Sequence, residues 1–364
     1  MPHGVPRGYA VPHGVPIQPM NIYEQQETNR RTTMVLLGAF LLLFLAVGAG
    51  FDFFYLSFNP IAGEPSYKLN SAGYYEAHNA RPQMIPYGTI AALLFGIAMV
   101  LNSVFNGPKM VLRSTMARRA VSTDPDEKQF INVVREMSIA SGVPMPGTYV
   151  VPDPDANAFA AGFSYDNAVI AVTEGLLKNL NREELQAVVA HEMSHIRNYD
   201  MRVMTVAAAL MGAIALISDF AGRSARYGGR SRGRSSGGGR SGKGGGAAVL
   251  ILFVVWLFLV ILAPLFSRML AMAISRQREF LADASAAELT RNPMGLVSAL
   301  EKIRSAVQPT QAINNGVAHM CITDPRGSLI EEKSGFAADL LATHPPMEKR
   351  ILALKMMAYQ KASA

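Results

Sequence analysis

The sequence predicts a mainly α-helical integral membrane protein with up to four transmembrane helices and an α+β domain that contains a small sheet. Half of the 364 residues are apolar and only 17% are charged, a balance too apolar for an ordinary soluble protein. Four long apolar runs interrupt the chain, and short β-branched segments lie between two of them. This composition excludes a wholly disordered, coiled-coil or collagen-like chain.

The first 33 residues are polar and proline-rich, and a five-residue repeat occurs at residues 2–6 and 12–16. Such a segment buries too little apolar surface to fold, so we expect a disordered tail over residues 1–33. His3 and His13 lie in the repeat, but two histidines on a flexible chain bind a metal weakly because ordering the chain costs entropy. Because no charged start with a small-residue cleavage site opens the chain, we expect the first apolar run to stay in place rather than to be removed as a signal peptide.

The apolar runs have the length of membrane spans. They cover residues 34–51, 88–105, 203–218 and 247–266. A helix needs about 20 residues to cross about 30 Å of hydrocarbon, so the first, second and fourth runs qualify and the third is marginal. We expect two apolar hairpins, residues 34–106 with spans at 34–56 and 88–106, and residues 201–266 with helices at 201–220 and 247–266. For the third run, a buried soluble helix or an interfacial segment is the alternative.

Basic residues near the span ends predict the orientation. Arg30 and Arg31 precede the first run and four basic residues follow the second, whereas the segment between the two runs has only Lys68 and Arg81. The tail and everything after the second run should therefore face the cytoplasm. The loop at residues 221–246 conflicts with this rule, because its seven basic residues would lie on the far side if the third and fourth runs both span.

That loop interleaves arginine with glycine and serine, as RNA-binding tails do. Tyr227 is its only aromatic residue, so stacking on bases has no support. A solvated linker with some attraction to anionic lipid is the better interpretation, and we expect no nucleic-acid partner.

Residues 107–200 and 267–364 form the two parts of the predicted folded domain. The first part has helical apolar spacing over residues 130–140. Three short strand patterns follow, at residues 149–151, 158–161 and 168–172. Asn181, with Glu184 three residues later, then predicts a capped helix start.

The helix after this cap carries His191-Glu192-Met193-Ser194-His195. Residues four apart stand on one helix face, so the two imidazoles can present nitrogens to one tetrahedral ion. Glu192 can reach a water molecule at that ion without being a ligand. We interpret the pattern as a metal site with a carboxylate base; a structural pairing of histidine and glutamate is the alternative.

A catalytic zinc ion needs three protein ligands and one open position, so a third ligand must come from elsewhere. The candidates are Glu279, His319, His344 and downstream carboxylates. Glu279 is favoured because Asp283 lies four residues later, on the same face of a helix that begins near residue 268.

The segment that contains the single cysteine is not expected to supply ligands or disulfides. The single cysteine, Cys321, excludes an intramolecular disulfide and a zinc site built from several thiolates. Residues 317–322 have the pattern of a strand, and we expect both His319 and Cys321 to be buried core residues.

Three motifs are spread along residues 30–358: His191-Glu192-x-x-His195, Arg278-Glu279-Phe280-Leu281-Ala282-Asp283, and His344-Pro345-Pro346 with Arg350-Ile351. Together with the four apolar runs they closely resemble the HtpX-like membrane zinc endopeptidases of the M48 family. The resemblance implies a zincin-type (gluzincin-like) catalytic domain with one Zn²⁺ per chain, held by His191, His195 and Glu279. It also implies that Glu192 is the general base and that Asp283 orients His191.

The resemblance extends to groups that would contact a substrate. The stretch Asn157-Ala158-Phe159-Ala160-Ala161-Gly162 looks like the family's edge strand, to which an extended substrate would hydrogen-bond. His344 and Arg350 match a late pair thought to stabilise the oxyanion, and a permanent cation suits that role. A helix start at His344 with a surface charge at Arg350 is the alternative.

The expected activity is hydrolysis of peptide bonds in misfolded or damaged membrane proteins, as in protein quality control. We expect a multi-pass protein of the plasma (inner) membrane whose catalytic domain faces the cytoplasm. Its expected partners are membrane lipids, unfolded or membrane protein substrates, and membrane quality-control proteins. A protease that processes lipidated or specific membrane-associated peptides, and a catalytically silent zinc-binding scaffold, are the alternatives.

Overall fold

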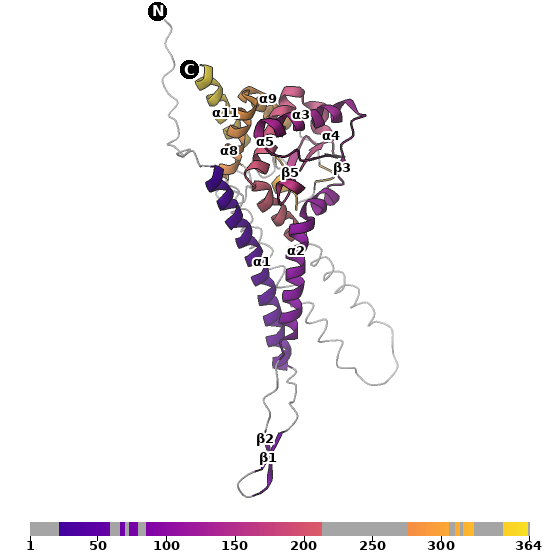
Figure 1. Ribbon diagram of the computed structural model, residues 1–364, viewed down its shortest axis with the longest axis vertical. Coiled ribbons are helices and arrows are strands. Elements are labelled where there is room, and N and C mark those ends of the chain that lie inside the picture. The colour runs from indigo at the N-terminus through magenta and orange to yellow at the C-terminus, as the bar shows by residue number, and fades with distance from the viewer. Residues whose placement is uncertain are drawn as a thin grey trace, which may run out of the picture.

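The computed structural model of the chain describes residues 22–58, 66–69, 73–78, 85–212, 276–305, 310–313, 316–323 and 345–362. Two long helices form a stalk beneath a mainly helical domain that holds a small sheet (Figure 1). This architecture confirms the predicted fold class. Residues 1–21, the loop at 221–246, the fourth apolar run and His344 lie outside the described residues, so what was predicted for them stays a prediction.

The stalk consists of α1 (Ile22–Phe58) and α2 (Tyr87–Ser114), which lie side by side (Figure 1). In the described part of the chain, these are the two helices long and apolar enough to cross a membrane. The first and second apolar runs are thereby confirmed as helices, and both helices extend beyond the runs.

The disordered tail predicted over residues 1–33 was too long, because α1 already begins at Ile22. Residues 22–33 lack an apolar run, but they include glutamate and glutamine, which favour helix. In addition, Gln25, Asn29 and Thr33 are buried. Contacts with distant parts of the chain, which no local pattern reveals, extend the helix toward the domain.

A carboxylate joins the two helices by hydrogen bonds at the end of the stalk farthest from the domain. Asp52 of α1 accepts hydrogen bonds from the backbone N–H groups of Gly88 (2.8 Å) and Thr89 (2.7 Å) and from the Thr89 hydroxyl (2.7 Å). The first N–H groups of a helix have no partner inside the helix, so Asp52 satisfies two of them in α2. Beyond this end, β1 (Ser66–Leu69) and β2 (Tyr75–His78) pair as an antiparallel hairpin that the sequence did not predict.

The domain contains a four-stranded sheet in the order β3-β4-β6-β5. Its strands are β3 (Arg118–Arg119), β4 (Gly147–Val151), β5 (Ala158–Ala161) and β6 (Val169–Thr173). β4 and β6 run parallel, and the other neighbours are antiparallel. The three predicted strands are confirmed with small shifts of their ends. β3 was missed because two arginines carry no strand pattern.

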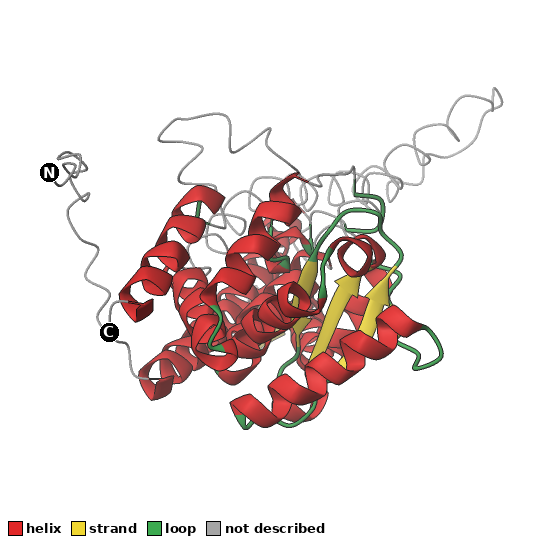
Figure 2. Cartoon of the chain, turned by 90° about the horizontal axis from the view of Figure 1, so that it is seen from above, coloured by secondary structure: helices red, strands yellow, loops and turns green. Residues whose placement is uncertain are grey.

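Besides the helical segment at residues 200–212, eight helices and 3₁₀ turns of the domain are described. They are α3 (Pro125–Ser141), η1 (Tyr165–Asn167), α4 (Glu174–Asn179), α5 (Arg182–Arg197), α8 (Arg276–Thr290), α9 (Pro293–Ser305), η2 (Ala318–Met320) and α11 (Met347–Ala362). Seen from above, the strands lie side by side and most helices gather to one side of them (Figure 2). α3 begins before the apolar spacing at 130–140 because Asp124 caps its N-terminus and Pro125 fits its first position.

α5 runs through the centre of the domain core, where it packs against α3, α8 and α9. Its apolar side chains are at most 1% exposed: Leu185, Val188, Val189, Met193 and Ile196. Burying each such side chain contributes about 1.5–3 kcal/mol to folding. The helix is therefore held firmly on several sides, and the position of its histidines is set by the core.

The third apolar run is helical over residues 200–212, as far as it is described. Val203 is buried against Leu36 of α1, and Val206 and Leu210 are buried in a cluster with Phe40. This part of the run therefore packs against the stalk at the point where the stalk meets the domain.

The strand predicted over residues 317–322 is wrong. Ala318–Met320 form the 3₁₀ turn η2, and a single bridge joins Cys321 to Phe159 of β5. The turn buries three consecutive side chains, and His319 Nε2 lies 3.3 Å from the carbonyl oxygen of Met204. His319 and Cys321 are 3% and 1% exposed, as expected for core residues.

Candidate active site

The site is built on α5, whose start is the predicted capping box: Asn181 accepts from the N–H of Glu184, and Glu184 accepts from the N–H of Asn181. Two turns later, His191 and His195 project from one face. Their Nε2 atoms lie 3.2 Å apart, and the two rings are nearly perpendicular. Both side chains are buried, and their Nε2 atoms face each other.

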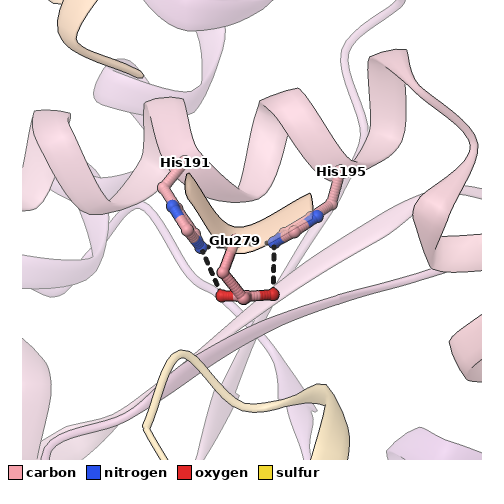
Figure 3. Close-up of side chains that lie close together, drawn as sticks. All are labelled: His191, His195 and Glu279. Atoms are coloured by element: carbon pink, nitrogen blue, oxygen red, sulfur yellow. Dashed lines mark hydrogen bonds and ion pairs between the residues drawn. The ribbon is translucent and has the colours of Figure 1, made fainter. Parts of the chain in front are cut away.

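Glu279 of α8 lies opposite the two rings and completes a triangle of ligand atoms (Figure 3). Its Oε2 lies 3.6 Å from His191 Nε2, and its Oε1 lies 3.6 Å from His195 Nε2. Ligand atoms bound at about 2.0–2.1 Å to a tetrahedral zinc ion are about 3.3 Å apart. Two imidazoles with Nε2 atoms 3.2 Å apart and one carboxylate form the kind of donor set that zinc takes, and one ligand atom from each residue lies within 4.8 Å of the others.

Asp283, one turn after Glu279 on α8, lies behind His191. Its Oδ1 is 3.0 Å from His191 Nδ1, the distance at which a carboxylate holds the ring with Nε2 toward the other ligands. Burial alone would lower the pKa of His191, but the carboxylates of Asp283 and Glu279 raise it to about 9.

Arg350 of α11 is fully buried against Asp283. Its Nε and Nη2 donate to the two carboxylate oxygens at 2.8 and 2.7 Å, and its Nη1 donates to the carbonyl oxygen of Ile322 at 2.8 Å. Nη1 also lies 3.6 Å from Oε2 of Glu279. Burial would raise the pKa of Asp283, but this guanidinium lowers it, so Asp283 stays ionised. The surface charge considered for Arg350 is therefore ruled out.

Asp200 orients the ring of His195, as Asp283 orients the ring of His191, and the sequence did not predict this role. Its Oδ2 lies 3.0 Å from His195 Nδ1, and both groups are buried. Its Oδ1 accepts from Asn29 Nδ2 of α1 at 2.6 Å and lies 3.8 Å from Arg278 Nε. An aspartate just past the end of the histidine helix was the available signal.

Glu192 lies between the two histidines on α5 and is 1% exposed. Its Oε2 is a buried atom with no hydrogen-bond partner in the described part of the chain. Burial raises its pKa, although the nearby histidines act in the opposite direction. A buried carboxylate oxygen that needs a donor suits a group that receives a proton from water.

The stretch Asn157–Gly162 contains β5, which is an edge strand as expected. Its outer edge, however, is partly covered: the N–H of Ile322 donates to the carbonyl oxygen of Ala158 at 2.9 Å, and Cys321 bridges Phe159. Ala158, Phe159, Ala160 and Ala161 are all at most 1% exposed. The open edge expected here is absent at residues 158 and 159, because the segment around η2 occupies it.

Comparison with known proteins places this geometry in a family. Residues 125–358 match the profile of Peptidase family M48. The chain belongs to peptidase family M48. The match spans both site helices, α5 and α8, and most of α11, and it confirms the enzyme class, a metalloprotease, that the motifs predicted.

Relatives of this M48 metalloprotease match along most of its length. The Protease HtpX homolog of Streptococcus uberis is 37% identical over 338 residues, 92% of this chain and 100% of the relative. The homolog of Streptococcus gordonii is 36% identical over 340 residues with the same coverage. That of Streptococcus equi subsp. equi is 42% identical over 270 residues, 74% of this chain and 86% of the relative. The resemblance to HtpX-like M48 membrane proteases is thus confirmed.

Among solved structures, the crystal structure of S. mikatae Ste24p aligns with 91% of this M48 chain and 67% of its own. The TM-score is 0.40 and the sequence identity 17%. A likeness this distant adds nothing to the assignment.

Proposed function

We propose that the chain is a membrane-anchored zinc endopeptidase that cuts misfolded or damaged membrane proteins at the cytoplasmic surface. The observation that carries the proposal is the buried cluster of His191, His195 and Glu279, in which one ligand atom from each residue lies within 4.8 Å of the others, with Glu192 buried beside it. Bound zinc supplies a Lewis acid that polarises the scissile carbonyl and makes water acidic enough to lose a proton near neutral pH.

Glu192 is the general base. Hydrolysis joins the water oxygen to the carbonyl carbon and breaks the C–N bond, so one proton must leave the water and one must reach the departing nitrogen. Oε2 of Glu192 has no partner to give up in the described part of the chain, so it is available to accept the first proton. Burial raises the pKa of Glu192, which makes its carboxylate a stronger base toward the proton of the water, and the proton it takes up is then passed to the departing amine.

Arg350 contributes positive charge and positions Asp283. Its guanidinium is held by Asp283 and by the Ile322 carbonyl, so it cannot swing far to meet a substrate. It favours negative charge at the carbonyl oxygen mainly through its field, which a buried site screens weakly. We propose that His344, close to α11 in sequence, donates the direct hydrogen bond to that oxygen.

The contact between Asp200 and Asn29 supports a location at the membrane surface. Asn29 lies five residues before Met34, where the first apolar run begins, so the two are about 8 Å apart along α1. The metal site is therefore close to the bilayer, and a membrane protein with an unfolded segment is the substrate most often within reach. The arginines before the first run favour the cytoplasmic face of a bacterial plasma (inner) membrane.

An extended substrate can add to β5 only where the edge remains available. The segment around η2 already pairs with Ala158 and Phe159, and the N–H of Gly162 donates to the Thr205 hydroxyl at 2.9 Å, which leaves residues 160 and 161 unless these contacts open. A substrate strand at these residues lies along the side of the sheet that contacts α5.

The test is cleavage of an unfolded membrane protein by the detergent-purified full chain, with and without a chelator, alongside Glu192→Gln. We expect the variant to retain zinc and to lose about 10²–10⁴-fold in turnover. Glu183→Gln is the matched control, because it makes the same exchange at an exposed position of the same helix. Wild-type rates in Glu192→Gln, or cleavage unaffected by the chelator, would refute the proposal.

The same experiment separates the alternatives. Preference for the unfolded over the folded form of one membrane protein supports quality control. Cleavage confined to one site in lipidated peptides would indicate a processing enzyme instead. Zinc accessible to a small inhibitor, with no cleavage of any offered chain, would indicate a scaffold.

A further inference from the structure

A second site lies where the stalk meets the domain, on the outer side of the contact between Asn29 and Asp200. It is a pocket of about 420 Å³. Its walls are Tyr23, Gln26, Glu27 and Arg30 of α1, and Tyr199 and Arg202 from the chain that follows α5. Two arginines from opposite walls therefore face one space, which the peptidase mechanism does not use.

Arg202 is held in place as a fixed cation. Its guanidinium carbon lies 4.6 Å from the ring centres of both Phe163 and Tyr199, and its Nε donates to the Phe163 carbonyl oxygen at 2.7 Å. Tyr199 in turn stacks on Tyr165, with ring centres 4.7 Å apart. Tyr199 has φ of 59°, a backbone conformation that tyrosine rarely adopts, and this places its ring beneath Arg202. Arg202 is thus pre-organised, and within the described part of the chain its Nη1 and Nη2 atoms have no hydrogen-bond partner.

The pocket carries an excess of positive charge. No carboxylate of the described residues forms an ion pair with Arg202 or Arg30, whereas Glu27 is paired with Arg31 at 3.0 Å. Burial lowers the pKa of Arg202, and the neighbouring charge of Arg30 acts in the same direction. Two guanidinium groups that form no ion pair among the described residues match the geometry and charge of a phosphate group.

The height of the pocket on α1 indicates where such a phosphate would come from. Arg30 is four residues, or about 6 Å along the helix, before the start of the apolar run at Met34. The headgroup layer of a bilayer extends about 5–8 Å beyond the hydrocarbon on each side. The pocket therefore lies at the depth of the lipid phosphates.

We propose that this pocket binds the phosphate of an anionic phospholipid headgroup between α1 and the segment 199–202. An anionic lipid is favoured over a zwitterionic one, because the two arginines would repel a headgroup cation. The bound headgroup would bridge the stalk and the turn that contains Asp200, so it would also stabilise the contact beside the metal site.

Native mass spectrometry of the detergent-purified full chain tests this, with phosphatidylglycerol, phosphatidylcholine or inorganic phosphate added in separate titrations. Arg30→Gln and Arg202→Gln each remove one cation from the pocket. Arg31→Gln is the matched control, because it removes the same charge one residue away and outside the pocket. Arg30 is exposed, so Arg30→Gln keeps the test decisive if Arg202→Gln does not fold.

We expect the wild type and Arg31→Gln to retain phosphatidylglycerol in preference to phosphatidylcholine, and the two pocket variants to bind it at least about tenfold more weakly. Saturable binding of inorganic phosphate that the pocket variants lose, without retention of lipid, would support the phosphate site and assign it to a free phosphate. Equal losses in all three variants would indicate diffuse attraction to anionic lipid and overturn the proposal. Lipid and phosphate binding unchanged in both pocket variants would overturn it as well.

Discussion

Removing the carboxylate of Asp200 should weaken zinc binding although Asp200 is not a ligand. A histidine that binds zinc through Nε2 must carry its proton on Nδ1, and Asp200 Oδ2 accepts at that nitrogen from 3.0 Å. His195 and Asp200 are 4% and 0% exposed, so water does not take over the lost contact. Partners of this kind contribute about 10–100-fold to metal affinity, or about 1.4–2.7 kcal/mol.

The size of the loss should follow the chemistry of the replacement. The amide oxygen of Asp200→Asn can still accept from Nδ1, so we expect about a tenfold loss. Asp200→Ala leaves Nδ1 without an acceptor and should lose about 100-fold. The measurement is competition for zinc between the purified chain and a chelating dye, with Asp166→Asn as a control at an exposed aspartate. Affinity in Asp200→Ala within about twofold of the wild type would refute the reasoning.

The hydrogen bond from Asn29 of α1 to Asp200 allows a second test of the role of Asp200 in zinc binding. Asn29→Leu keeps the shape of the side chain but removes the 2.6 Å hydrogen bond to Asp200 and a 2.9 Å hydrogen bond to the Asn198 carbonyl oxygen. It should weaken zinc binding by less than Asp200→Ala. Gln26→Leu is the matched control, because Gln26 also joins α1 to this turn, through the Arg197 carbonyl, without touching Asp200. Equal effects of the two α1 variants would mean that general docking of the helix, rather than this hydrogen bond, controls the site.

Three further predictions concern the ligand, the buried cation and pH. Glu279→Ala should lose bound zinc together with activity, and stoichiometric zinc by elemental analysis would contradict its role as a ligand. Arg350→Leu leaves Asp283 buried without its cation and should lower the free energy of unfolding by about 3–5 kcal/mol. An unchanged thermal midpoint of the metal-free chain would contradict this prediction. Burial alone would raise the pKa of Asp153, but hydrogen bonds, chiefly from residues 310–312, hold it below its ordinary value. This lowered pKa stabilises the fold at neutral pH and the gain is lost as pH falls below about 4, so the deficit in thermal midpoint of Asp153→Asn should shrink in acid. A deficit independent of pH would argue against it.

Features that lie within one helix could be predicted from the sequence. The spacing of His191 and His195 and the cap formed by Asn181 and Glu184 involve residues at most four apart, where helix geometry alone decides which side chains meet. The same holds for Glu279 and Asp283 on α8.

Features that depend on contacts between distant segments could not be predicted. Asn29 and Asp200 are 171 residues apart, and the turn between α5 and Asp200 depends on the unusual backbone of Tyr199. Likewise, nothing local indicates that Arg350 is buried against Asp283, or that the segment around η2 covers the edge of β5. In each case a polar group is placed by partners that the fold brings together, and no periodicity in the sequence reports them.

The carboxylate at the far end of the stalk has a consequence for how the protein is assembled. Asp52 lies 18 residues, or about 27 Å, beyond Met34, so a lone first span would bring a charged group to the opposite face of the hydrocarbon with no partner. The backbone donors of Gly88 and Thr89 become available only when the second span is alongside. The partners of this carboxylate thus exist only in the paired hairpin, so the hairpin rather than the single helix is the unit in which the first span is complete.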